Sequence, residues 1–107
     1  MTFDLTYAPM DLSSTLRRAV CLATGTADFD GTTGDVIDPN DVRMGKIFAI
    51  HDLFAAVGGV GYIGLFTADN GNGQPAVFWY DPNTGNLAAD HVNFAGFGAF
   101  PVEVVGQ

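Results

Sequence analysis

The sequence predicts an all-β protein, a small antiparallel β-sandwich or barrel with one short helical turn and an extended N-terminal arm. The chain has 107 residues, 48% of them apolar, which is enough for the core of one domain but not of two. Its 12 acidic residues are 11 Asp and one Glu, and it has one Lys, whereas surface helices are built largely from Glu, Lys, Arg, Gln and Ala. Asp collects in turns, and 14 glycines and five prolines add further turn residues.

The N-terminal residues 1–14 are too apolar for a solvated tail. Phe3, Leu5 and Tyr7 alternate with more polar residues, as in an extended segment, and Met10 follows. Two interpretations fit equally well: an arm that lies on a neighbouring molecule, or an ordinary first edge strand of the same domain. Residues 15–107 then form a single β-rich domain.

Residues 15–23 fit two patterns. Leu16, Ala19 and Ala23 fall at helical spacing, with serines before them as possible caps. The alternation that runs from Val20 to Thr26 fits a strand. We favour the strand, because the rest of the chain has β character.

A short helical turn is predicted over residues 39–44. Asp38 can cap its N-terminus, Pro39 can occupy the first helical position, and Gly45 can end it. A strand over residues 46–54 is expected to follow.

The second half of the chain predicts strands separated by turns. Gly58-Gly59 ends the preceding strand, and residues 68–74 form a hairpin loop. The clearest turn runs from Asp81 to Gly85, where Pro82 presets the first turn position and the glycine supplies a left-handed residue. The strands expected between and after these turns are residues 62–67, 75–80, 86–89 and 102–105.

The charge balance excludes two classes of partner. The formal net charge is −8 at pH 7, and only four residues are basic. Nucleic-acid binding normally needs a basic face, so neither nucleic acid nor an anionic membrane surface is an expected partner. The longest stretch without charge, residues 53–68, is shorter than the ~18–20 residues of a membrane-spanning helix. No basic segment precedes an apolar stretch near residue 1, so we expect no secretion signal.

Three features point to chemistry, and each has a simpler structural interpretation. Residues 59–64 match the spacing of a dinucleotide-binding loop, but β-forming residues follow where that loop needs a helix. His51 and Asp52 are neighbours, which face opposite sides of a strand and so form no dyad. The lone Cys21 lies among small apolar residues, which predicts a buried thiol and fits a reducing cytoplasm. We expect no enzymatic activity and no cofactor.

The aspartates of residues 28–38 carry an alternative hypothesis, a calcium site. A calcium loop that starts at Asp28 needs Gly at its sixth position and Glu at its twelfth, which here are Thr33 and Pro39. Solvated turn residues are the simpler interpretation, here and in residues 69–73, so no metal is expected.

Aromatic side chains form the remaining cluster. All five residues from Ala76 to Tyr80 are apolar, so both faces of this strand are expected to be covered. Either the domain's own core covers them, or another subunit covers one face, because exposed apolar patches mark interfaces. Stacking of a carbohydrate on Trp79 or Tyr80 is a minor alternative. The residues predicted to form an interface are Phe3, Leu5, Tyr7, Met10, Phe78, Trp79, Tyr80 and Phe97.

Several short stretches occur in a recognisable order between Ala27 and Gly106. They are Ala-Asp-Phe-Asp at 27–30, Gly-Asp-Val-Ile-Asp-Pro-Asn-Asp-Val-Arg-Met-Gly at 34–45, Gly-Val-Gly-Tyr at 59–62, Tyr-Asp-Pro-Asn-Thr-Gly-Asn-Leu at 80–87 and Val-Val-Gly at 104–106. In this order they resemble small virion structural proteins of tailed bacteriophages, the capsid decoration (cement) or head proteins.

The resemblance implies a β-rich fold on a capsid lattice, without catalytic residues. The expected partners are the major capsid protein and copies of the chain itself, as a homo-oligomer for which a trimer is one option. The expected location is the capsid surface of a virion assembled in the host cytoplasm. The alternatives are a calcium- or carbohydrate-binding β-module and a component of the tail or neck.

Overall fold

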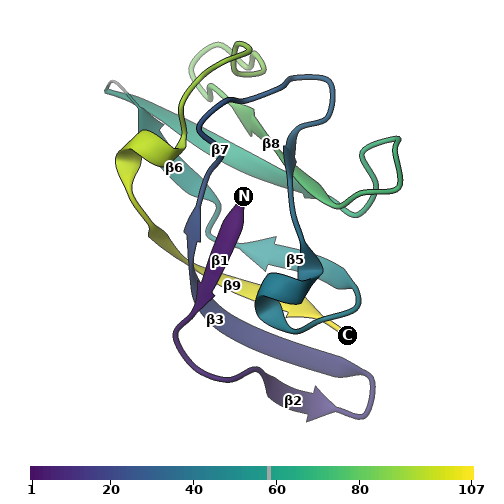
Figure 1. The fold of residues 1–107 in the computed structure, drawn as a ribbon. Helices are drawn as coiled ribbons and strands as arrows, with labels where there is room; N and C mark the ends of the chain where they lie inside the picture. The colour runs from purple at the N-terminus through teal and green to yellow at the C-terminus, as the bar shows by residue number, and fades with distance from the viewer. Residues whose placement is uncertain (58) are drawn as a thin grey trace.

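Two antiparallel sheets enclose the core in the computed structural model, which describes residues 1–57 and 59–107 (Figure 1). This confirms the predicted all-β class. The five-stranded sheet has the order β1-β3-β9-β5, with β2 also paired to β3, and comprises β1 (Thr2–Leu5), β2 (Met10–Ser13), β3 (Leu16–Thr24), β5 (Ile47–His51) and β9 (Phe100–Gly106). The four-stranded sheet has the order β4-β8-β7-β6 and comprises β4 (Asp35–Val36), β6 (Phe54–Val57), β7 (Val60–Thr67) and β8 (Ala76–Tyr80).

Among the described residues, helical structure is limited to single turns. The 3-10 helices are η1 (Pro39–Val42) and η2 (Ala95–Phe97). Within the part of the chain that the structure describes, no helix is long and apolar enough to cross a membrane. The molecule measures 41 × 28 × 21 Å along its principal axes.

The N-terminal segment belongs to the chain's own five-stranded sheet. β1 pairs with the second half of β3, so that Phe3 lies opposite Ala23. β2 pairs with the first half of the same strand. Of the two interpretations that the sequence left open, the structure shows the edge strand and not an arm free to lie on a neighbouring molecule.

β3 confirms the strand interpretation of residues 15–23. Ala19, Cys21 and Ala23 are buried, and the positions between them are more exposed, as expected for a strand with one face on the core. Burial, followed by the charge of Asp4, raises the pKa of the Cys21 thiol to about 11. The thiol is therefore a buried apolar group, as the sequence predicted.

The predicted helical turn is present but ends early. The carboxylate of Asp38 accepts a hydrogen bond from the N–H of Asn40 at 3.0 Å, and Pro39 occupies the first turn. Arg43 takes the left-handed position, at φ 56°, that was predicted for Gly45. Gly45 instead donates its N–H to the carbonyl of Gln107 at 2.8 Å, because it starts the pairing that leads into β5.

The prediction of a single strand over residues 46–54 is wrong, because this stretch holds two strands that belong to different sheets. β5 ends at His51 in the five-stranded sheet, and β6 begins at Phe54 in the four-stranded sheet. Asp52 lies between them with φ 68°. Asp tolerates this left-handed conformation better than most residues, so it can turn the chain from one sheet to the other.

The strand predicted over residues 86–89 is reduced to a single bridge between Tyr80 and Leu87. The N–H of Ala88 still donates to the carbonyl of Trp79 at 2.8 Å. Further pairing is prevented because β4 occupies the same edge of β8, with Asp35 opposite Val77. The sequence analysis did not predict β4. The sequence also predicts that Gly58-Gly59 ends a strand, and Gly58 lies outside the described residues.

Aromatic rings fill the space between the sheets. The indole of Trp79 stacks on Phe94 with 5.1 Å between ring centroids, and Phe29 meets Phe94 edge-on at 5.5 Å. Gly64 on β7 leaves room for the indole. A Cβ at Gly64 would lie 3.0 Å from Cζ3 of Trp79 and 2.8 Å from Cβ of Leu53.

One ion pair is buried beside this core. The ammonium group of Met1 contacts Oδ1 of Asp35 and donates to the carbonyl of Val36 at 2.9 Å. The second carboxylate oxygen accepts from the N–H of Thr26 at 2.9 Å and from Nε1 of Trp79 at 3.3 Å. The carboxylate therefore joins β1, β4 and β8 at one point.

Candidate interaction surface

The outward face of the four-stranded sheet is the candidate functional site, and alternation along β7 creates it. Tyr62 and Phe66 pack against the core. Ile63 and Leu65 lie between them in sequence, point the other way, and are exposed. Since all four side chains are apolar, β7 presents hydrophobic surface on both sides of the sheet.

Strand register places the outward side chains of three strands next to one another. Phe54 on β6 lies opposite Ile63, and Ile63 lies opposite Tyr80 on β8. Leu65 lies opposite Phe78 in the next outward row. Directly opposed side chains in an antiparallel pair have Cβ atoms only ~4.5–5.5 Å apart. These five residues form one continuous patch, which we call the outer face.

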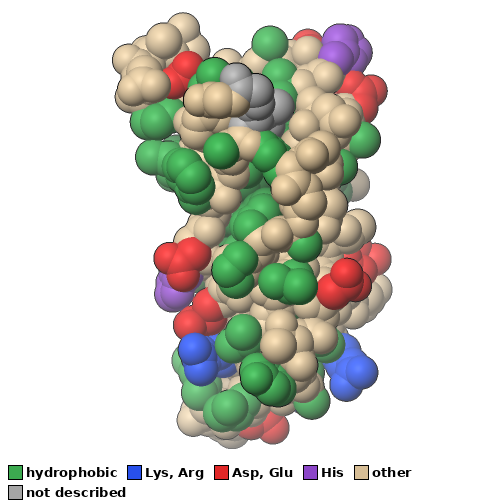
Figure 2. Space-filling view, turned by 90° about the vertical axis from the view of Figure 1, so that its left-hand side faces the viewer, with side chains coloured by type: hydrophobic (Ala, Val, Ile, Leu, Met, Phe, Trp, Pro, Cys, Tyr) green, Lys and Arg blue, Asp and Glu red, His purple; other side chains and the backbone are tan. Residues whose placement is uncertain are grey.

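The side chains of the outer face are large and incompletely covered. Leu65 is 57% exposed, Phe54 56% and Ile63 43%, whereas Phe78 and Tyr80 are half-buried. A single exposed apolar side chain is ordinary, but a group of five on one sheet face is typical of a surface that another molecule covers. In Figure 2 hydrophobic side chains lie at the surface over the whole height of the molecule, whereas the Lys and Arg side chains in view lie near its lower end.

Two aromatic rings of the outer face lie over glycines. A Cβ on Gly61 would come within 2.8 Å of Cζ of Phe54. A Cβ on Gly34 would come within 3.0 Å of the ring of Phe78. Because each ring occupies the space above a glycine, the rings spread along the sheet and do not project from it.

The outer face is uncharged although the protein is strongly acidic. The sequences of β6, β7 and β8 contain no Asp, Glu, Lys, Arg or His. Acidic residues occur just beyond the strand ends, at Asp52, Asp69 and Asp81. The surface is therefore an apolar centre with an acidic rim.

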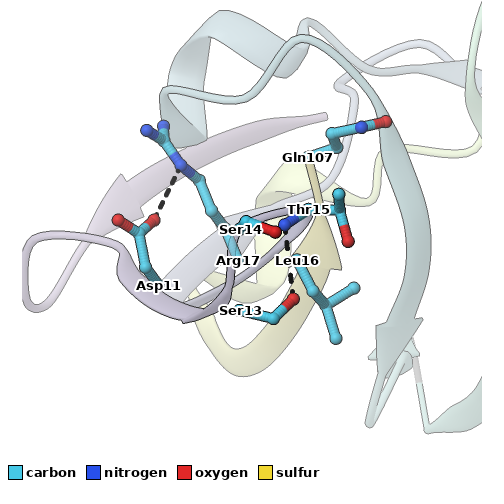
Figure 3. Close-up of a pocket in the computed structure, with 7 residues that line it drawn as sticks. All are labelled: Asp11, Ser13, Ser14, Thr15, Leu16, Arg17 and Gln107. Carbon is cyan, nitrogen blue, oxygen red and sulfur yellow. Dashed lines mark hydrogen bonds and ion pairs between the residues drawn. The ribbon is translucent and has the colours of Figure 1, made fainter.

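A second exposed apolar group lies at the other end of the molecule, in β2 and the segment just before it, along the first half of β3. It comprises Tyr7, Met10 and Leu12, which are 71%, 59% and 51% exposed, and we call it the tip. The turn between β2 and β3 is polar (Figure 3). Nε of Arg17 lies 3.0 Å from Oδ1 of Asp11, and a shallow hollow beside this pair is lined by Ser13, Ser14, Thr15, Leu16 and Gln107.

The structure divides the eight residues predicted for the interface into three groups. Tyr7 and Met10 are exposed at the tip, and Phe78 and Tyr80 lie on the outer face. Leu5 and Phe97 are half-buried against the core. The prediction is wrong for the remaining two, Phe3 and Trp79.

Phe3 and Trp79 fill the chain's own core and are 5% and 0% exposed. Neither side chain is available to a partner, and Trp79, stacked on Phe94, offers no face to a carbohydrate. Strand alternation explains the error for Trp79, since its neighbours on β8 point outward while it points inward.

The sequence analysis missed three residues of the outer face, Phe54, Ile63 and Leu65. A signal for two of them was present in the sequence. Residues 62–66 are apolar on both faces of the strand apart from Gly64, which is the same pattern that singled out residues 76–80. Phe54 was hidden because residues 46–54 were read as one strand.

The aspartate loops use their carboxylates to hold turns. Asp69 accepts from the N–H groups of Gly71 and Gly73 at 2.8 and 2.9 Å. Asp30 likewise accepts from the N–H of Thr32 at 2.7 Å. Asp35 is buried against Met1, so the aspartates of residues 28–38 do not converge. In residues 1–57 and 59–107, no group of three or more His, Cys, Asp or Glu side chains is arranged to hold a metal ion.

Both histidines make exposed polar contacts. Nδ1 of His91 lies 2.7 Å from Oδ1 of Asp28, and this hydrogen bond, with the carboxylate charge, raises the pKa of the imidazole. Nδ1 of His51 lies 3.6 Å from Oε1 of Glu103, so His51 does not pair with Asp52. Nη2 of Arg18 lies 2.8 Å from Oε2 of Glu103, and this contact lowers the pKa of that carboxyl group.

A comparison of the chain with protein-family models, curated proteins and solved structures found no match. The outer face and the tip are therefore the features that bear on its function.

Proposed function

We propose that this chain is a non-enzymatic virion structural protein, a capsid decoration protein of a tailed bacteriophage. In this role it docks onto a lattice of the major capsid protein and stabilises the shell. The observation that carries the proposal is the exposed apolar surface of the outer face and the tip, on a domain whose own core is already filled by Trp79 and Phe94. A surface of this kind is suited to binding another protein.

The energetics suit a protein that acts in many copies. Burial of apolar area contributes about 25 cal/mol per Å², so a few hundred Å² per contact gives useful but modest stabilisation. A lattice multiplies this contribution because each copy is held by several neighbours. The choice of a capsid lattice is supported by the order of turn and glycine motifs, which resembles that of small virion proteins.

The test is binding of the purified chain to shells assembled from the major capsid protein encoded in the same genome. We expect the chain to co-sediment with shells in a fixed ratio to the capsid subunit and to raise the temperature at which they rupture. Saturable binding to tails or necks and not to shells would contradict decoration and place the chain elsewhere in the virion.

The same preparation tests the alternative of a calcium- or carbohydrate-binding module. The melting temperature of the isolated chain is measured with calcium, with a chelator and with a panel of sugars. We expect no shift, because the loop carboxylates of Asp30 and Asp69 are engaged by backbone N–H groups. A large rise with calcium or a sugar, combined with no binding to shells, would replace the proposal.

A further inference from the structure

We propose that Asn72 is a site of spontaneous deamidation, at which the folded protein slowly exchanges a side-chain amide for a carboxylate. The site lies in the loop that joins β7 to β8, residues 68–75, where the sequence reads Asn-Gly-Asn-Gly from 70 to 73. Both Asn70 and Asn72 precede a glycine, but the fold restrains Asn70 and leaves Asn72 free to react. The inference goes beyond the proposed function and does not depend on it.

Deamidation is an intramolecular reaction of an Asn side chain with the residue that follows it. The backbone nitrogen of that residue forms a bond to Cγ of the Asn, and the bond from Cγ to Nδ2 breaks. The proton of the backbone N–H leaves with Nδ2 as ammonia, and a cyclic succinimide remains. Water then opens the ring at either carbonyl and gives Asp or isoaspartate, without an oxidant or reductant. Glycine favours ring closure, because it has no side chain beside the attacking nitrogen and adopts many backbone conformations.

The two attacking nitrogens have similar surroundings. The N–H of Gly71 donates to Oδ1 of Asp69 at 2.8 Å, and the N–H of Gly73 donates to the same oxygen at 2.9 Å. Both glycines have a positive φ, 96° and 77°, and a Cβ on either would have no neighbour within 4 Å. The backbone nitrogens therefore do not distinguish the two sites, so the difference lies in the side-chain amides that they attack.

The amide of Asn70 is held by the fold. Its Nδ2 donates to the carbonyl oxygen of Thr33 at 2.8 Å, which ties the loop to the segment before β4. Its Oδ1 accepts from the N–H of Asn72 at 2.9 Å, and the residue is half-buried. Ring closure expels Nδ2 and draws Cγ onto the backbone nitrogen, so it breaks the first hydrogen bond and displaces the acceptor of the second. Two hydrogen bonds of ordinary net strength slow such a step by roughly tenfold or more.

Asn72 has neither restraint. The residue is exposed, and within the described part of the chain its side chain has no hydrogen-bond partner, since the bond to Asn70 comes from its backbone N–H. Its amide can therefore approach the nitrogen of Gly73 without breaking a contact of the fold. The product is also tolerated, because a carboxylate at position 72 lies in solvent. A carboxylate at position 70 could no longer donate to Thr33.

The reaction changes the charge of the protein. Each event adds one negative charge, so the net charge of the chain passes from −8 to −9. The new carboxylate lies three residues from Asp69, at the acidic rim of the outer face. Because the reaction needs no enzyme, copies of the chain are expected to differ in charge according to their age.

The experiment is incubation of the purified full chain at mildly alkaline pH, once folded and once unfolded in guanidinium chloride, followed by isoelectric focusing. We expect the folded chain to gain one acidic species and the unfolded chain to gain two, because unfolding releases Asn70. Mass spectrometry of peptides from the folded sample should place the first change at Asn72. Conversion of Asn70 in that sample should be slower by roughly tenfold or more.

The variant is Asn72→Gln, and its matched control is Asn83→Gln, which changes an exposed Asn that Thr84 follows in another turn. Gln keeps the amide, but its longer side chain closes the ring far more slowly. We expect the folded Asn72→Gln chain to gain no acidic species and the control to behave like the parent chain. Thermal melts check that both variants fold, and the peptide masses of the parent chain test the site without any substitution.

Three results would overturn the inference. They are a folded parent chain that gains no acidic species while the unfolded chain does, equal conversion of Asn70 and Asn72 in the folded chain, or an acidic species that persists in folded Asn72→Gln. None of these measurements uses capsid shells, so they leave the proposed function as it stands. Failure to bind shells likewise contradicts the proposed function only.

Discussion

Asp35 illustrates how a single residue can hold several parts of this chain together. Its carboxylate contacts the Met1 ammonium group and accepts from Nε1 of Trp79 out of reach of water, and it also accepts from the half-buried N–H of Thr26. A buried ion pair gains little over a hydrophobic pair, but removing one partner leaves the other charge unsatisfied. The residue is therefore more important to stability than its place in a two-residue strand suggests.

The first prediction concerns this carboxylate. Asp35→Asn keeps the shape of the side chain but removes the charge that pairs with the ammonium group. We expect a loss of about 3–5 kcal/mol in the free energy of unfolding, measured by urea denaturation. Asp38→Ala, which removes only the cap of η1, should cost about 1 kcal/mol. Equal effects of the two changes would contradict the role given to the ion pair.

The second prediction concerns Gly64, whose missing side chain makes room for Trp79. Gly64→Ala places a methyl group within 3.0 Å of Cζ3 of Trp79 and closer still to Leu53. Overpacking of this kind costs about 1–3 kcal/mol. Gly45→Ala is the control, because its Cβ would have no neighbour nearer than 3.7 Å. The melting temperature of the first variant should fall, and that of the control should stay close to the parent.

The third prediction concerns the pH dependence of the His91–Asp28 contact. Its hydrogen bond to Asp28 raises the pKa of His91 above the ordinary 6.5. A group with a higher pKa in the folded state stabilises the fold fully below its unfolded pKa, and this contribution is lost as the pH rises through the folded pKa. An NMR titration should show the raised pKa, and Asp28→Asn should lower it. A titration unchanged by Asp28→Asn would contradict the assignment.

At the scale of elements, the sequence predicted strands well where one face alone meets the core. β3 is an example, because its buried alanines and Cys21 alternate with more exposed positions. Prediction failed where pairing partners decide the outcome. Residues 86–89 follow a turn that brings the chain back along β8, but β4 already pairs with Ala76 and Val77 on the same edge, and no local pattern reveals a competitor from residues 35–36.

The candidate site was only half predictable for a related reason. Apolar residues on both faces of residues 76–80 indicated that something covers each face, and Phe78 and Tyr80 do lie on the outer face. Which member of an alternating pair points outward depends on the register with β7, which the strand itself does not specify. Trp79 was therefore assigned to the interface although it lies in the core.

The fourth prediction concerns the break between β5 and β6. Asp52 turns the chain between the two sheets in the left-handed region, at φ 68°. Asp52→Gly should be neutral or stabilising, because Gly adopts this conformation without steric cost. Asp52→Val should lose about 1–3 kcal/mol, because a β-branched side chain is strained there. Thermal melts of the pair separate backbone strain from loss of the carboxylate, since both variants lack it.

At the scale of the whole molecule, charge and apolar surface are unevenly distributed. The basic residues gather at the end that holds the start of β3 and β5. There Nη1 of Arg17 donates a hydrogen bond to the carbonyl oxygen of Arg43 at 3.0 Å. The tip lies at this end as well, because β2 pairs with the start of β3. The outer face belongs to the other sheet, so its apolar surface is separate from the tip and available to a different partner (Figure 1).

The fifth prediction separates these two surfaces. Tyr7→Ser combined with Met10→Ser should leave folding unchanged but weaken binding to capsid shells. Loss of two apolar contacts worth about 1.5 kcal/mol each corresponds to roughly a hundredfold rise in Kd. The test is co-sedimentation with shells, with Leu22→Ser as a control for removal of an exposed leucine from the same sheet. If the double variant folds and binds shells normally, the tip does not meet the lattice, and the outer face is the surface that does.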